Sequence, residues 1–121
     1  MIVRPTRLIR SIARACSPDL IQPRIQKNRP GDAHHTWGCC YIASEALYHL
    51  WGKKHGFRLY YIRFDNQYGH FFLKDADGVV MDPTRRQFQG SGLPLRYSQG
   101  TCMGFLTKKP SNRCKRLLAR I

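Results

Sequence analysis

The sequence predicts an α+β fold in which a central helix packs on a small antiparallel sheet and further helices lie near both ends. Residues 40–51 place apolar side chains at spacings of three and four, the period of one helix face. The segments 57–64, 69–74 and 79–82 are rich in aromatic and branched residues and are separated by turn sequences. A chain of 121 residues can bury one modest core, so we expect a single domain, 1–121.

The N-terminal segment, residues 1–30, is basic and is expected to begin with a short helix. Thr6 is a suitable N-cap for this helix. Its apolar stripe would consist of Leu8, Ile9 and Ile12. Residues 17–19 could start a further helical turn, whereas Pro23 and residues 28–32 indicate a loop that leads to the central helix.

The central helix is the most regular pattern in the chain. One of its faces would carry Cys40, Ala43, Ala46, Leu47 and Leu50. Glu45 and His49 would share the opposite face. Gly52 is a natural C-cap, and the two lysines that follow it suit the negative end of the helix dipole.

The second and third strands are expected to form a hairpin. The length of its loop decides whether His70 and Asp82 lie on the same face of the sheet. Asp75-Ala76-Asp77-Gly78 is a turn sequence, and a loop made of its last three residues would place the glycine in the left-handed conformation of a bulge. Because side chains alternate along a strand, this odd loop pairs Phe72 with Asp82 and puts His70 on the same face as Asp82. A four-residue loop would separate His70 from Asp82.

The C-terminal part is expected to add an edge strand and a helix. Residues 84–95 indicate a loop, and residues 102–106 are expected to form the edge strand. Ser111 is predicted to begin the last helix. The inward face of that helix would carry Cys114, Leu117, Leu118 and Ile121.

The positive charge of the chain lies mainly at its two ends. The formal net charge is +14, yet residues 31–100 are close to balanced, whereas residues 1–30 and 101–121 are strongly basic. We expect these ends to meet an acidic protein or a nucleic acid first. The basic patch would consist of Arg4, Arg7, Arg10, Arg14, Lys115, Arg116 and Arg120.

The cysteine content and hydropathy indicate the compartment. The chain has 5 cysteines, an odd number without regular spacing, which favours a reducing compartment, and we expect a cytoplasmic protein. No apolar run approaches the roughly 18–20 residues that cross a bilayer, so we expect no membrane partner. We also expect a monomer.

Cys40, His70 and Asp82 are the candidate catalytic residues. A thiol becomes a useful nucleophile when its thiolate is stabilised, which a helix N-terminus and a nearby imidazolium both do. Cys40 stands at the start of the predicted helix, where its backbone N–H could also hold an oxyanion. His70 would take the thiol proton, and Asp82 would fix the tautomer and orientation of the imidazole.

These residues belong to a longer pattern that resembles a known family. The order of four segments is similar to that in the transglutaminase-like branch of the papain-like cysteine superfamily: Gly38-Cys39-Cys40, residues 56–63, His70-Phe71-Phe72-Leu73 and Met81-Asp82-Pro83-Thr84. The resemblance covers about residues 37–84. It implies a minimal papain-like core and acyl transfer on a protein or peptide-like amide, as a peptidase, amidase, deamidase or transglutaminase. No cofactor is expected.

The second oxyanion donor is open. His34 stands six positions before Cys40, where the family has a glutamine. The candidate donors or alternative residues are Cys39, His34, His35 and Gln67, with Gln26 as a further option. Cys39 is also the rival nucleophile, although Cys40 occupies the position that matches the family pattern.

Two other classes of function compete with catalysis. The histidines and cysteines of residues 34–40 could form a zinc site, but adjacent cysteines cannot easily both point at one metal ion, so we expect no metal. A non-catalytic module that binds nucleic acid or an acidic protein through the basic ends could keep the same fold. Binding of that kind would depend steeply on salt concentration.

Overall fold

The structure is a computed structural model that describes residues 4–64, 69–91 and 95–121; the prediction for Gln67 lies outside them. The α-helices are α1 (Thr6–Ala15), α2 (Pro23–Gln26), α3 (Cys40–Leu47) and α4 (Asn112–Leu118). The strands are β1 (Arg58–Arg63), β2 (Gly69–Lys74), β3 (Val80–Met81) and β4 (Thr101–Met103). A π-helical turn covers Tyr48–Gly52, and 3-10 turns cover Pro18–Leu20, Lys53–His55, Arg85–Phe88 and Tyr97–Gln99.

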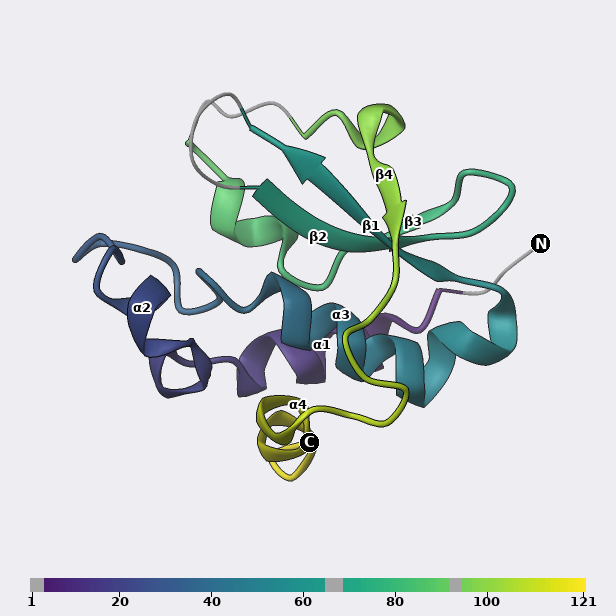
Figure 1. The fold of residues 1–121 in the computed structure, drawn as a ribbon. Coiled ribbons are helices and arrows are strands. Elements are labelled where there is room, and N and C mark those ends of the chain that lie inside the picture. The colour runs from purple at the N-terminus through teal and green to yellow at the C-terminus, as the bar shows by residue number, and fades with distance from the viewer. Residues whose placement is uncertain (1–3, 65–68, 92–94) are drawn as a thin grey trace.

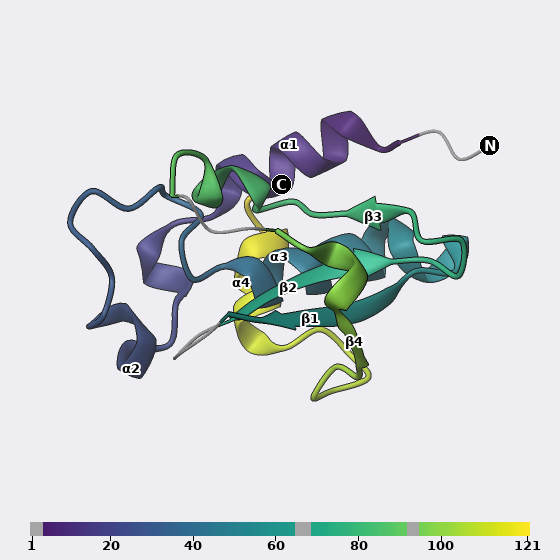
Figure 2. The ribbon, with the colours of Figure 1, turned by 90° about the horizontal axis from the view of Figure 1, so that it is seen from above.

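The architecture is α+β, as the sequence predicts. Its antiparallel sheet has the strand order β3-β2-β1-β4, so the first three strands form a meander and β4 joins the other edge of β1. Helix α3 lies along the sheet, α4 lies on the side of α3 away from the sheet, and α1 lies beside α3 (Figure 1). Seen from above, α1 runs beside β3 (Figure 2). There the Arg4 guanidinium donates to the Val80 carbonyl at 3.2 Å.

The sheet separates two apolar clusters of different size. The main core fills the space between α3, the sheet and the terminal helices, and its buried side chains include Ile12, Leu47, Leu59, Leu73 and Leu117. The smaller cluster consists of Ile62, Phe64 and Phe72. Because Phe72 and Leu73 are adjacent on β2, they point to opposite faces of the sheet. His70 shares the face of Phe72, and therefore borders the smaller cluster.

The β2–β3 hairpin has the predicted odd loop. The paired residues are Leu73 with Met81 and Lys74 with Val80. The Asp75 N–H donates to the Val79 carbonyl at 3.1 Å, which leaves residues 76–78 as the loop. Gly78 has φ +86°, the left-handed conformation that only glycine adopts at little cost. The prediction of a three-residue loop with a left-handed glycine is confirmed.

The end of the central helix was predicted wrongly. Gly52 does not end it, because the chain continues through the π-helical turn and a 3-10 turn to Gly56, whose φ is +80°. Gly52 is buried, and a Cβ atom added there would lie 3.0 Å from the Leu73 side chain and 3.3 Å from Phe57. Its small size therefore serves close packing of helix against sheet, and Gly56 is the C-cap.

The predicted faces of the central helix also need correction. Glu45 is fully buried, although it was predicted opposite to the core face, because α4 covers that side. Its carboxylate accepts hydrogen bonds from the Ser111 N–H and the Ser111 hydroxyl, both at 2.8 Å. Leu50, predicted on the core face, is 40% exposed because the π-helical turn rotates it away.

Smaller differences occur at the ends of other elements. Pro5, not Thr6, precedes the first residue of α1, and no side chain caps that helix. Pro23 begins the short helix α2, where its missing N–H is no loss, instead of lying in a loop. Ser111 caps α4 as predicted, since its hydroxyl accepts from the Cys114 N–H, but Ile121 is 47% exposed beyond the end of the helix.

Candidate active site

His70 and Asp82 form a buried pair on neighbouring segments of the hairpin. The His70 Nε2 atom lies 2.7 Å from the Asp82 Oδ2 atom, and the two side chains are 0% and 2% exposed. The register places them diagonally across the strands, on one face of the sheet. The hydrogen bond fixes the ring so that Nδ1 points away from Asp82.

Asp82 is held by two further donors. The Tyr97 hydroxyl donates to Asp82 Oδ2 at 2.8 Å, and the Thr84 N–H donates to Oδ1 at 3.3 Å. Burial and the Asp82 carboxylate raise the pKa of Tyr97 above its ordinary value, so the hydroxyl keeps its proton as a donor. Sequence reasoning missed Tyr97, which follows a segment read only as a loop. The Thr84 donor has a local signal in the Asp-Pro-Thr sequence, since aspartate commonly accepts from the N–H two residues on.

Cys40 occupies the first position of α3 and is partly exposed. Within the described residues, the N–H groups of Cys40 and Tyr41 donate to no backbone carbonyl outside the helix, as expected in a first helical turn. These free donors and the helix dipole favour negative charge near the Cys40 sulfur. The same N–H groups could hold an oxyanion.

His70 interacts electrostatically with both Asp82 and Cys40. Burial acts to lower its pKa, but hydrogen bonds to Asp82 and Cys40, together with their charges, outweigh burial and raise the pKa to about 9. Nδ1 is buried and makes no hydrogen bond of standard geometry to the described residues, whereas Nε2 is used by Asp82. Nδ1 is therefore the nitrogen available to the thiol. With this pKa, the ring is protonated at neutral pH.

Aromatic side chains enclose the imidazole ring. The Phe88 ring meets it edge-on with 4.6 Å between centroids, and Phe72 stacks at 6.4 Å. Tyr97 packs on Phe72 at 4.9 Å. This apolar surround lowers the local dielectric constant, which strengthens the interaction of His70 with Asp82.

Cys39 is turned into the core and away from His70. It is fully buried, and its thiol donates to the Ser17 carbonyl at 3.8 Å. The interaction with the neighbouring Cys16 thiol lowers the pKa of Cys39 against the effect of burial, while the pKa of Cys16, whose thiol donates to the Ile12 carbonyl at 3.3 Å, is raised. Cys39 therefore has no access to the site as a side-chain donor or nucleophile.

His34 and His35, the histidine candidates for the second oxyanion donor, line a different part of the molecule from Cys40. One ring nitrogen of His34 hydrogen bonds to the Thr36 hydroxyl at 2.8 Å, and the His35 Nε2–H donates to the Ala13 carbonyl at 2.9 Å. Both rings line a cavity that also touches Asp82 but does not include Cys40 among the described residues. Gln26 is exposed and donates to the Pro18 carbonyl at 2.9 Å.

The structure therefore brings together the three predicted catalytic residues, Cys40, His70 and Asp82, and adds Tyr97 as a further partner of Asp82.

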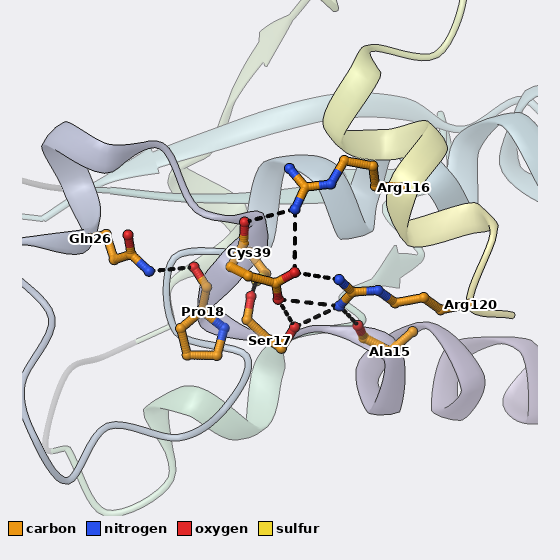
Figure 3. A network of polar contacts seen from close by, with 8 residues as sticks. Ala15, Ser17, Pro18, Gln26, Cys39, Arg116 and Arg120 are labelled. Atoms are coloured by element: carbon orange, nitrogen blue, oxygen red, sulfur yellow. Dashed lines mark hydrogen bonds and ion pairs between the residues drawn. The ribbon is translucent and has the colours of Figure 1, made fainter.

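Part of the predicted basic patch is used inside the molecule. Arg116 of α4 and Arg120, which follows the helix, converge beside Ser17 and Pro18 (Figure 3), where both bind the Asp19 carboxylate. Arg120 also donates to the Ala15 carbonyl at 3.2 Å. Hydrogen bonds from Arg120 and Ser17 hold the pKa of Asp19 at about 2. This network joins α4 to the segment that follows α1, whereas Lys115 is exposed.

The comparisons with known proteins found no relatives. The chain matches no protein-family model, no curated protein and no solved structure. Across residues 4–64, 69–91 and 95–121, no group of three or more histidine, cysteine, aspartate or glutamate side chains could hold a metal ion. In the same residues, every helix is too short or too polar to cross a bilayer.

Proposed function

We propose that the protein is a cysteine-dependent acyl-transfer enzyme built on a minimal papain-like or transglutaminase-like core. Cys40 is the nucleophile, His70 the general acid and base, and Asp82 the residue that orients His70. The substrate class is a protein or peptide-like amide, and the reaction is hydrolysis, deamidation or amine transfer. Its setting is the cytoplasm, and the enzyme needs no cofactor.

In the proposed acylation step, Cys40 acts as a thiolate and His70 as an imidazolium. The Cys40 thiolate attacks the carbonyl carbon of the amide, and the carbonyl electrons move to oxygen, which the first N–H groups of α3 stabilise. The His70 imidazolium then gives its Nδ1 proton to the leaving nitrogen as the C–N bond breaks. The products are a free amine, or ammonia from a primary amide, and a thioester on Cys40.

Deacylation uses the same groups in reverse. Neutral His70 removes a proton from water or from an acceptor amine, which attacks the thioester carbon. The C–S bond breaks, the thiolate returns, and His70 is again protonated. Water gives a carboxylic acid, and an amine gives a new amide. Asp82 keeps the ring in place throughout.

One observation supports this proposal above the others. The His70 ring is fixed to Asp82 through Nε2 at 2.7 Å, while the buried Nδ1 has the Cys40 thiol as its electrostatic partner. A histidine with only a structural role would be expected to have Nδ1 satisfied by a backbone carbonyl or another polar side chain. The long-range order of cysteine, histidine and aspartate adds the family resemblance to this geometry.

Alkylation of the thiols with iodoacetamide between pH 5 and 10 tests the assignment, with each site read by peptide mass spectrometry. Cys102 is exposed and serves as the internal reference. We expect Cys40 to react at pH 6–7 at least about tenfold faster than Cys102, because a thiolate paired with an imidazolium persists where an ordinary thiol is protonated.

Two variants sharpen this test. His70→Gln should remove the advantage of Cys40 at pH 6–7, and Asp82→Asn should reduce it, while the rate at Cys102 stays unchanged in both. Equal rates at Cys40 and Cys102 in the parent protein, or an advantage that survives His70→Gln, would sink the proposed catalytic pair.

A second candidate is a binding module for nucleic acid or an acidic protein. The observation that favours it is the set of exposed arginines on α1, Arg7, Arg10 and Arg14, for which no ion pair occurs within the described ranges. If Cys40→Ala leaves the biological activity intact and neutral substitutions of these arginines abolish it, this second function is the correct one.

A further inference from the structure

A cavity of about 680 Å³ lies between α1 and the segment 80–86. Its inner wall includes Asp82, and the loop that carries His34 and His35 lines one side. Figure 2 shows α1 and β3, which approach it from two sides, running next to each other. A volume of a few hundred to about 1,000 Å³ is typical of sites for small molecules. The cavity is therefore large enough to hold a small ligand.

The charge of the lining is strongly one-sided. Five arginines contribute to it, namely Arg4, Arg10, Arg14, Arg85 and Arg86, against the single carboxylate of Asp82. That carboxylate is 2% exposed and already accepts from His70 and Tyr97, so it offers little to a cation in the cavity. The lining presents a surplus of positive charge from residues 4–14 and from residues 85–86.

Most of these arginines have no protein partner. The Arg4 side chain donates to the Val80 carbonyl, but the side chains of Arg10, Arg14, Arg85 and Arg86 make no hydrogen bond or ion pair to any residue within 4–64, 69–91 and 95–121. Burial and the charges of His35 and Arg86 lower the pKa of His34, which keeps that ring neutral beside them. Arg116 and Arg120 differ, because both form ion pairs with Asp19.

We propose that this cavity is a binding site for a small ligand that carries two or more phosphate groups. Guanidinium groups bind phosphate oxygens through paired N–H donors, and arginines on two walls match an anion with more than one charged group. A focused positive potential inside a cavity also raises the local anion concentration. The site does not depend on the chemistry of Cys40, which is not among its lining residues.

Calorimetric titration of the full chain with inorganic tripolyphosphate, at constant ionic strength, tests the site. The parent should bind one equivalent. Arg10→Gln with Arg86→Gln should weaken binding at least about tenfold, because it removes charge-assisted hydrogen bonds from both walls. Arg7→Gln with Arg58→Gln is the matched control, since it removes the same charge from α1 and from a site outside the cavity.

The control variant should bind within about twofold of the parent, because long-range charge alone is screened at physiological ionic strength. Replacement of Arg10 and Arg86 by lysine should recover part of the affinity, which excludes a folding defect. Equal weakening in the two glutamine variants, several equivalents bound by the parent, or no binding by the parent would overturn the proposal. A single-stranded oligonucleotide that binds tightly and is displaced by neither tripolyphosphate nor the cavity substitution would point to a nucleic-acid surface and also overturn it.

Discussion

Cys39 and Cys40 are adjacent in the chain, yet their surroundings are opposites. Cys39 is the residue before α3, and its thiol lies among Cys16 and the Ser17 carbonyl, under the corner where α1 leads into the next turn. Cys40 is the first residue of α3 and lies on the side of His70, partly open to solvent. One thiol is core packing, and the other is a candidate nucleophile.

The difference arises from a single step around a helix. Successive residues in a helix are rotated by about 100°, so two neighbours at its start cannot share a direction. Gly38, with φ +81°, brings the chain into this position close to the Ile21 side chain, which lies 3.0 Å from where its Cβ would stand. The position of α3 between the α1 corner and the hairpin then decides which thiol meets the imidazole.

The largest effect should come from the two cysteines when each is changed alone. We expect Cys40→Ser to reduce hydrolysis of an activated aryl ester by at least about 10³-fold, because the nucleophile acts as a unit with its base. Cys39→Ser should retain activity within about threefold. Stopped-flow release of the aryl alcohol measures both, and the parent should show a burst of one equivalent as the acyl-enzyme forms.

Circular dichroism of both serine variants is the control for folding. Loss of the burst in Cys39→Ser, with the burst kept in Cys40→Ser, would reverse the assignment of the two thiols.

A smaller effect should appear in the pH dependence of stability. The pKa of His70 in the folded protein is about 9, above its ordinary value of 6.5, so folding favours the protonated ring. This stabilisation is fully present below pH 6.5 and is lost as the pH rises towards and past 9. Its size should be about 3 kcal/mol, from the 1.36 kcal/mol that corresponds to one pH unit.

Urea denaturation at pH 6 and pH 9.5 measures this contribution, with the His70→Gln protein as the reference. Cys40→Ala should reduce the difference between the two pH values, since it removes one of the groups that raise the pKa of His70. Cys39→Ala should leave it unchanged. A parent protein as pH-insensitive as His70→Gln would show that the imidazole is not held in its charged form.

The hairpin and its site could be predicted because their signals are local. The Asp-Gly turn fixed the loop length, and strand alternation then placed His70 and Asp82 together. No comparable local signal exists for Tyr97, which reaches Asp82 only through a tertiary path. Tyrosine followed by serine and glutamine in an irregular segment gives no period to follow.

The interior around α3 could not be predicted for a related reason. Helical periodicity indicates one apolar face, so Glu45 was placed opposite to it, but α4 from the far end of the chain covers that side and supplies the Ser111 donors. Gly52 resembles a cap in the sequence because a cap and a close-packing contact both favour glycine. Only the short distance from Gly52 to the Leu73 side chain shows that the glycine serves close packing and is not a helix cap.

The smallest effect should be on stability, and it tests the same contrast without catalysis. In the His70→Gln background, where the charge interaction is absent, Cys39→Ala should cost about 1–2 kcal/mol because it empties a fully buried position. Cys40→Ala should cost less than about 1 kcal/mol, since its side chain is partly exposed and its loss leaves no closed cavity. Urea denaturation at pH 7 compares the two. A larger cost at Cys40 than at Cys39 would mean that Cys40 is the packing residue, and the contrast between the two thiols would then no longer support a nucleophile at the start of α3.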